Sequence, residues 1–169
     1  MTASDETGTD AEPDLREIRA RLHGTNINQQ TLLATDYLNH FNEIVMTLEM
    51  VPDFLDLWDE VKDWRPISYT EHFQNSAFSD KDLAIEAYGH VPERYRTPFE
   101  QTIGQVIQLV ETVIPRLDTA IANGGADELR HLATESSHNI KRLLEIASAI
   151  IHGSETTMDQ TEIDALLGE

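Results

Sequence analysis

The sequence predicts an all-α protein, a helical bundle built on one long antiparallel helical hairpin. Two segments, Pro98 to Ala122 and Ala126 to His152, carry apolar residues at the spacing of an amphipathic helix. Between them, Asn123-Gly124-Gly125 supplies residues that readily end a helix and reverse the chain. No segment of useful length alternates apolar and polar residues with the period of a strand. We therefore expect no sheet.

The two predicted helices of the hairpin face each other through apolar seams. At about 1.5 Å per residue, each helix is roughly 40 Å long. Pro115 is expected to kink the first helix, because proline lacks a backbone donor and clashes with the preceding turn. The predicted seams comprise Phe99, Ile103, Val106, Ile107, Val110, Val113, Ile114, Leu117 and Ile121 on the first helix and Leu129, Leu132, Ala133, Ser136, Ile140, Leu143, Leu144, Ala147, Ile150 and Ile151 on the second.

The chain begins with a polar lead and a short helix. Residues 1–12 contain four acidic residues, no basic residue and no apolar periodicity, so we expect a disordered acidic lead. Residues 14–23 have an amphipathic pattern that Gly24 ends. The helical bundle domain is predicted to span residues 13–152, and a linker with a C-terminal docking peptide is predicted for 153–169.

A longer helix is predicted to begin at Asn26 or Asn28, because asparagine is a favoured N-cap residue. It is expected to run to Met50, where Pro52 ends it. The apolar face of this helix is predicted to consist of Leu33, Tyr37, Phe41, Ile44, Val45 and Leu48.

Short helices are predicted in the middle of the chain, from Asp53 to Pro92. Ser68 and Glu71 have the spacing of a capping box, which marks a helix start. Because aromatic side chains bury large areas, we expect this stretch to form a structural lid over the bundle. Two tryptophans are the expected anchors, with four more aromatic residues packed around them: Trp58, Trp64, Phe54, Tyr69, Phe73 and Phe78.

The composition indicates one acidic domain. The chain has 169 residues, no cysteine and a formal net charge of −19. This charge argues against nucleic acid as a partner, because a nucleic-acid interface needs a basic surface. No apolar run approaches the roughly 20 residues of a membrane helix, and the N-terminus lacks a signal pattern. We expect a cytoplasmic protein that does not bind membranes. The charge favours a basic or metal-bearing partner, or reflects a halophilic source.

The C-terminal segment has the pattern of a docking peptide. Ile163, Leu166 and Leu167 form one apolar stripe at i, i+3 and i+4. Asp159 and Glu162 have the spacing of a capping box at the start of this stripe. A helix this short is marginal alone, so we expect it to order against a groove. The acidic residues Asp159, Glu162 and Asp164 favour a groove with a basic rim.

The sequence of this segment resembles the N-terminal peptide of the flagellar motor switch protein FliM. The resemblance covers Met158-Asp-Gln-Thr-Glu-Ile-Asp-Ala-Leu-Leu167. It is also similar to the acidic, leucine-bearing C-terminal peptide of the chemotaxis phosphatase CheZ family. Both resemblances imply that the segment binds the phosphorylated chemotaxis response regulator, CheY. The alternative is a last helix that folds back on its own domain.

A second resemblance lies on the first helix of the hairpin. Gln101, Gln105 and Gln108 share a polar face beside Gly104. A glycine inside an exposed helix costs about 1 kcal/mol relative to alanine, and close approach of another backbone would explain it. The stretch resembles the CheZ motif, in which a glutamine follows glycine on a long hairpin helix. The resemblance implies that Gln105 orients water for attack on the regulator's aspartyl phosphate. Gln101 stands where the family has an acid.

Two other sets of side chains have the residue types of a metal site but not its placement. Glu128, His131, Glu135 and His138 lie about 140° from the apolar seam, whereas metal ligands in a bundle project inward. Asp36, His40 and Glu43 lie about 100° from their seam. We interpret both sets as solvated faces and expect no metal site and no cofactor in the chain.

These observations favour a protein that binds a phosphorylated, CheY-like response regulator of the chemotaxis or flagellar system. CheZ-like dephosphorylation is the first mechanism, with Mg²⁺ carried by the partner regulator. A non-enzymatic adaptor that uses the same tail is the second. The third is a helical protein unrelated to chemotaxis whose tail docks internally. We expect self-association into a homodimer through the hairpin.

Overall fold

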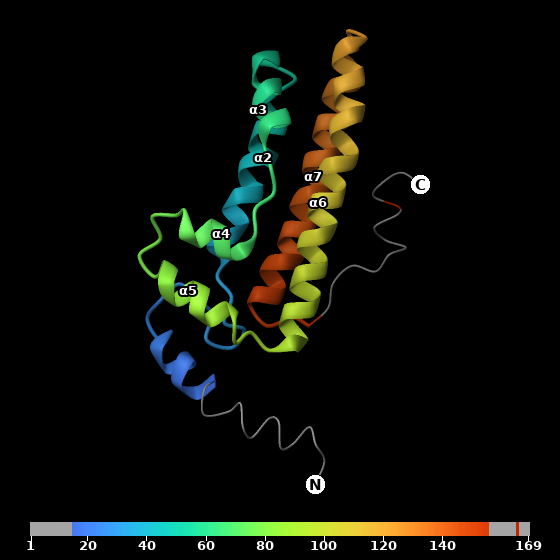
Figure 1. The fold of residues 1–169 in the computed structure, drawn as a ribbon. Coiled ribbons are helices and arrows are strands. Elements are labelled where there is room, and N and C mark those ends of the chain that lie inside the picture. Colours follow the sequence, from blue (N-terminus) through green and yellow to red (C-terminus); the bar gives the residue numbers. More distant parts are fainter. Residues whose placement is uncertain (1–14, 156–164, 166–169) are drawn as a thin grey trace.

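The computed structural model of this protein describes residues 15–155 and Ala165 (Figure 1). The predicted acidic lead, residues 1–12, lies outside the described residues. So do the predicted docking residues, which are Asp159, Glu162, Ile163, Asp164, Leu166 and Leu167.

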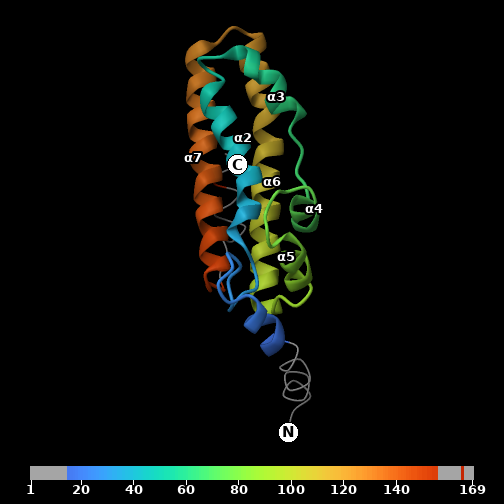
Figure 2. The same ribbon diagram turned by 90° about the vertical axis from the view of Figure 1, so that its left-hand side faces the viewer.

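Two long helices form the antiparallel hairpin that the sequence predicts. Helix α6 spans Glu93–Ala122 and helix α7 spans Ala126–Ile151. They lie side by side along their whole length (Figures 1 and 2). Gly124, with a φ of 69°, lies in the turn between them, where a residue with a side chain would be strained. The described residues form helices, turns and one isolated bridge, so the expected all-α fold is confirmed.

Helix α6 begins one turn earlier than predicted and is uninterrupted by its prolines. Pro92 precedes the helix in an extended conformation, and its carbonyl accepts the backbone N–H groups of Tyr95 and Arg96. Pro98 and Pro115 both lie inside the helix. The kink at Pro115 stays a prediction.

The predicted seams of the hairpin are confirmed. Every seam residue is buried or packs partly buried against the core. The seam prediction missed Thr102, Leu109 and Ala120, which are also buried on α6. The apolar seams of α6 and α7 therefore form one side of the hydrophobic core.

Helix α2, Asn39–Met50, packs against α7 and completes the core (Figure 2). The 3-10 helix η1, Thr35–Leu38, leads into it. The predicted start at Asn26 or Asn28 is wrong. The Asn28 side-chain oxygen instead accepts the backbone N–H groups of Gln30 and Thr31, at 2.8 and 2.9 Å, and so closes a turn.

The chain that leads into α2 is therefore a buried loop and not a helix. Leu32 has a φ of 66°, which no helical residue adopts. Ile27 and Ala34 pair as an isolated bridge across the loop. Leu33 is buried as predicted, but from this loop. The predicted end of the helix, before Pro52, is confirmed. The short first helix is also present, over residues 15–21, and Gly24 follows it with a φ of 78°.

Short helices cover one side of the bundle, as predicted. They are η2 (Leu55–Leu57), α3 (Trp58–Asp63), α4 (Tyr69–Gln74) and α5 (Lys81–Tyr88). Ser68 caps α4, because its hydroxyl accepts the Glu71 backbone N–H at 3.1 Å. This bond confirms the predicted helix start with Ser68 as its N-cap, and the Ser68 hydroxyl also lies 3.3 Å from Oε1 of Glu71.

The expected aromatic cluster of the lid divides in two. Trp64 stacks on His40, with ring centroids 4.9 Å apart. Phe73 instead packs between Tyr69 and Phe78, with centroids 4.8 and 5.2 Å away. The prediction for Phe54 is wrong, since its side chain is 57% exposed. The turn after α2 directs it outward, with the Phe54 backbone N–H bonded back to the end of that helix.

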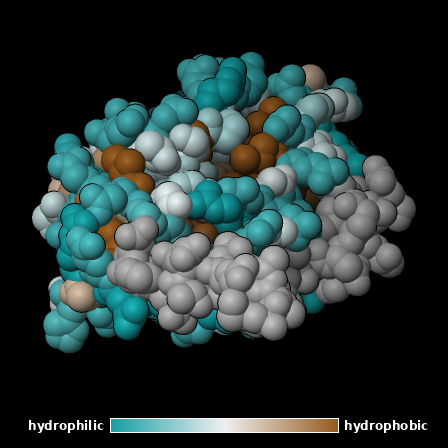
Figure 3. All heavy atoms as spheres, turned by 60° about the horizontal axis from the view of Figure 1, so that its bottom comes forward, coloured by the Kyte–Doolittle hydropathy of each residue, from teal (hydrophilic) through white to brown (hydrophobic). Residues whose placement is uncertain are grey.

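The described surface is mainly polar. On the face shown in Figure 3, apolar residues appear only in small patches separated by hydrophilic ones. No helix in residues 15–155 is long and apolar enough to cross a membrane.

Candidate functional site on helix α6

The glutamines singled out by the sequence lie on the solvent side of α6. Gln101 and Gln108 are exposed, and Gln105 is half-buried. Residues three and four apart share one side of a helix, so the three amides form one row, which we call the glutamine edge. The helix continues for several turns on both sides of Gln105. This edge therefore has a rigid support.

Gly104 lies in the middle of the helix with open space beside it. A side-chain carbon built at this position would meet no atom within 4 Å outside its own helix turn. Close approach of another backbone was one expected reason for this glycine, but within the described residues no such backbone lies within 4 Å of that carbon. The space beside Gly104 is therefore available to a molecule other than this chain.

Glu100, the acid next to Gln101, points to the opposite edge of α6. Its Oε1 accepts the hydroxyl of Tyr88 at 2.8 Å and lies 3.5 Å from Nη1 of Arg96. These contacts hold the carboxylate away from the glutamine edge. Glu100 therefore does not take the place of the acid that the CheZ motif has where this chain has Gln101.

A pocket of about 410 Å³ opens on that opposite edge, and no sequence pattern predicted it. Its walls come from η1, the chain from Pro66 to the start of α4, the end of α5 and the first half of α6. Such a site has no local sequence signature, because its residues are far apart in the chain. We call it the aromatic pocket; it is lined by Tyr37, Pro66, Ile67, Ser68, Tyr69, Tyr88, Phe99, Glu100, Ile103, Gly104 and Ile107.

The tyrosines of the aromatic pocket remain neutral over a wide pH range. Burial, followed by the hydrogen bond to Glu100, raises the pKa of Tyr88 to about 12. Burial is also the main cause that raises the pKa values of Tyr37 and Tyr69. The three hydroxyls therefore act as hydrogen-bonding groups and not as bases.

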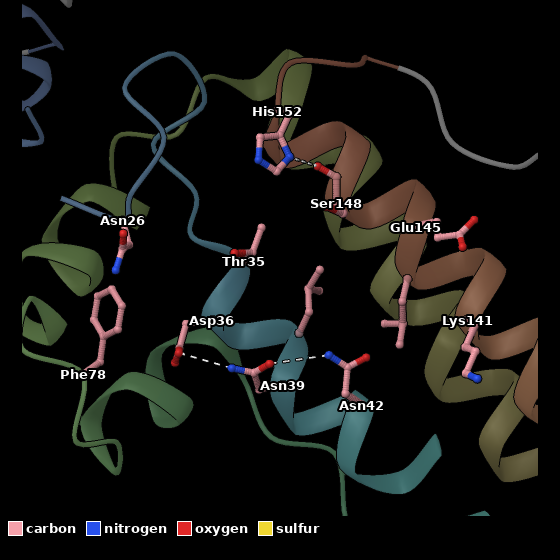
Figure 4. A pocket seen from close by; sticks show the side chains of 12 residues that line it. Asn26, Thr35, Asp36, Asn39, Asn42, Phe78, Lys141, Glu145, Ser148 and His152 are labelled. Carbon is pink, nitrogen blue, oxygen red and sulfur yellow. Dashed lines mark hydrogen bonds between the residues drawn. The ribbon is translucent and has the colours of Figure 1, made fainter. Parts of the chain in front are cut away.

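A larger, more polar cavity of about 810 Å³ lies between α2 and α7 (Figure 4). Its polar side chains bond mainly to one another or to the backbone around its rim. Asn39 donates to Asp36 at 3.3 Å, and a ring nitrogen of His152 lies 2.7 Å from the Ser148 carbonyl oxygen. Lys141, on the same rim, pairs with Glu49. The side chains shown in Figure 4 are spread around the cavity and do not converge on one point.

The side chains that the sequence analysis discounted have structural contacts. A ring nitrogen of His72 lies 2.8 Å from Asp36, and a ring nitrogen of His40 lies 2.7 Å from the Arg65 carbonyl oxygen. On α7, Glu128, His131, Glu135 and His138 are all exposed. Within the described part of the chain, no group of His, Asp and Glu side chains is arranged to hold a metal ion.

The C-terminal segment starts at the end of α7, where Gly153 and Ser154 close the helix. The backbone N–H groups of Gly153 and Ser154 close α7 by bonding to Ile150 and Ala149, each at 2.9 Å. Gly153, with a φ of 118°, packs on Gln30. The Gln30 amide in turn donates to the Tyr95 hydroxyl at 2.6 Å. The chain therefore leaves the domain beside the first turns of α6.

We compared the chain with known protein families, curated proteins and solved structures. The chain matches no protein-family model, and neither curated proteins nor solved structures give a match.

Proposed function

We propose that this protein binds a phosphorylated response regulator through its C-terminal segment and promotes loss of the regulator's phosphoryl group. The observation that supports this proposal most is the position of Gln105. It lies on the solvent side of an uninterrupted helix, next to a glycine whose flank is open. The open flank of Gly104 gives a partner access to this part of the helix.

Gln105 is suited to orienting a water molecule. Its amide donates and accepts hydrogen bonds, so it can fix a water by both. The water oxygen forms the new bond to phosphorus, and the bond between phosphorus and the aspartyl oxygen breaks. The products are a free carboxylate and inorganic phosphate. Positioning of this kind is the main contribution that proteins make to phosphoryl transfer, and the Mg²⁺ of this reaction belongs to the regulator.

The C-terminal segment is suited to act as a tether. The chain leaves the domain beside Tyr95, which lies about 15 Å along α6 from Gln105. The few residues between Glu155 and Asp159 span about 13 Å when extended. A regulator bound to the docking residues is thereby held near the glutamine edge, which raises its effective concentration there. Pairing of two hairpins in a homodimer remains a further prediction.

A non-enzymatic adaptor is the second candidate function. It is favoured by the absence of an acid on the glutamine edge, since Gln101 is neutral and Glu100 bonds to Tyr88. A neutral amide does not pair with a regulator's active-site lysine as a carboxylate does. Under this alternative the tail binds the regulator and Gln105 has no role in chemistry.

Binding of the full chain to a CheY-like regulator tests the part that both functions share. The regulator is compared with and without a phosphoryl mimic, by titration calorimetry. We expect tighter binding with the mimic, and loss of binding when Leu166 and Leu167 are both replaced by alanine, because each buried leucine contributes roughly 1.5–3 kcal/mol. Equal binding by wild type and the double variant would reject the docking role of the tail.

A further inference from the structure

The aromatic pocket on α6 is held in shape by contacts within the protein. The rings of Tyr69 and Tyr88 stack with their centroids 4.4 Å apart and their planes 17° from parallel. Phe99 lies against Tyr69 edge to face, at 6.1 Å. The guanidinium of Arg96 lies 4.6 Å from the centre of the Tyr88 ring. These contacts form a preorganised aromatic wall, which lowers the cost of ordering side chains when a ligand binds.

The tyrosine hydroxyls of the pocket already have partners. Tyr37 donates to the Ile67 carbonyl at 2.7 Å, Tyr69 accepts the Ala34 backbone N–H at 2.9 Å, and Tyr88 donates to Glu100 at 2.8 Å. The carboxylate of Glu100 is the charged group of the lining. Its contacts with Tyr88 and Arg96 are both made by Oε1. A carboxylate has about four acceptor sites on its two oxygens, so Glu100 has capacity for another donor.

Gly104 keeps the mouth of the pocket open. It lines the pocket beside Ile103 and Ile107, and a side-chain carbon at position 104 would project into empty space. A longer side chain there would extend across the mouth. This opening is a second reason for a glycine at a helix position where alanine is the more stable residue.

We propose that the aromatic pocket binds a small organic cation, an aromatic or branched aliphatic group that carries an ammonium. Its volume lies within the range of roughly 300–1,000 Å³ that ligand sites occupy, and its lining is mainly apolar with one charged group. The apolar part of the ligand packs between the aromatic rings and the isoleucines. The ammonium lies at the mouth, where the Glu100 carboxylate, which also pairs with Arg96, accepts its N–H groups.

Three probes of similar shape test the ligand class: phenethylamine, 2-phenylethanol and 3-phenylpropionate. Their binding to the full chain is measured by ligand-observed NMR at low salt. We expect the amine to bind most tightly, the alcohol roughly fivefold more weakly and the acid weakest. Equal binding of all three, or no binding of the amine, would overturn the proposal.

Variants locate the site. Ile107→Trp fills the pocket and Gly104→Leu blocks its mouth, so each should abolish amine binding. Glu100→Gln should remove the preference for the amine over the alcohol. Glu111→Gln, an exposed acid on the same helix outside the pocket, should change neither. Gly104→Ala should keep binding, since the added methyl meets no atom within 4 Å. Amine binding that survives both blocking variants in a folded protein would place the ligand elsewhere and reject the assignment.

Discussion

The two edges of α6 differ in what they touch. On one edge, Ile103 and Ile107 line the aromatic pocket, and Asp118 accepts the indole N–H of Trp58 at 2.9 Å. On the other edge lies Gln105, two residues from each of those isoleucines and therefore about 160° away around the helix. One edge is built from segments distant in the sequence, whereas the other presents a row of amides to the solvent side.

The two edges of α6 therefore contribute differently to the stability and to the surface of the protein. The pocket edge contributes to stability, because it joins α6 to α3, α5 and η1. The glutamine edge can change its chemistry at little cost to the fold, because its side chains lie on the helix surface. The two edges meet at Gly104, which lies beside the glutamine row and also lines the aromatic pocket.

Replacing a ring on the pocket edge should have the largest effect. Phe99 is 1% exposed, so Phe99→Ala is expected to lower the free energy of unfolding by about 3–5 kcal/mol. Gln108→Ala on the other edge and Phe54→Ala at the exposed turn should each change it by less than about 0.5 kcal/mol. Chemical denaturation measures all three. Similar losses for Phe99→Ala and Gln108→Ala would contradict the division between the edges.

Alkaline pH should weaken the pocket edge selectively. The pKa of Tyr88 in the folded protein is about 12, above its ordinary value of 10.0. Its contribution to stability is therefore complete below pH 10 and is lost as the pH rises from 10 to about 12. The pKa values of Tyr37 and Tyr69 are also raised in the folded protein, so their ionisation at high pH lowers stability as well. Denaturation midpoints measured across this range should fall, and Tyr88→Phe should make the fall shallower. An equal slope in the variant would show that Tyr88 is not a cause.

Filling the gap beside Gly104 should have a smaller effect, and a favourable one. Gly104→Ala is expected to raise the free energy of unfolding by about 1 kcal/mol, because alanine has the higher helix propensity and its methyl group meets no atom within 4 Å. Thermal denaturation would reveal the shift. A loss of stability would mean that the space beside Gly104 is not open.

The smallest expected effect concerns the tail. If its apolar stripe serves a partner, replacing Leu166 and Leu167 by alanine should leave the melting temperature of the free protein unchanged. A lowered melting temperature would instead favour the alternative in which the tail folds back on its own domain.

The long hairpin was predictable from the sequence because its signal is local and repeated. Each helix carries an apolar residue at every turn, and Gly124 lies in the reversal with a positive φ. The start of α2 was not predictable in this way. Asn28 is a good N-cap residue, but its side chain closes a turn, and the left-handed conformation of Leu32 prevents a helix there.

The candidate site was predictable only in part. The row of glutamines follows from helical spacing, and the structure places it on the solvent side of α6 as expected. The aromatic pocket could not be found from spacing, because Tyr37, Tyr88 and Ile103 meet only when three separate segments pack together. The contact between Glu100 and Tyr88 likewise depends on how α5 lies against α6.

We propose that the glutamine edge acts on a phosphorylated regulator through Gln105. The most direct test follows dephosphorylation of a CheY-like regulator in time, with wild type, Gln105→Ala, Gln108→Ala and Gln101→Asp at equal concentration. We expect wild type to accelerate phosphate loss, Gln105→Ala to reduce the acceleration on the order of 100-fold, and Gln108→Ala to match wild type. Gln101→Asp should increase the rate by restoring the acid of the family pattern. A wild type no faster than the regulator alone, or a Gln105→Ala variant as active as wild type, would contradict the claim.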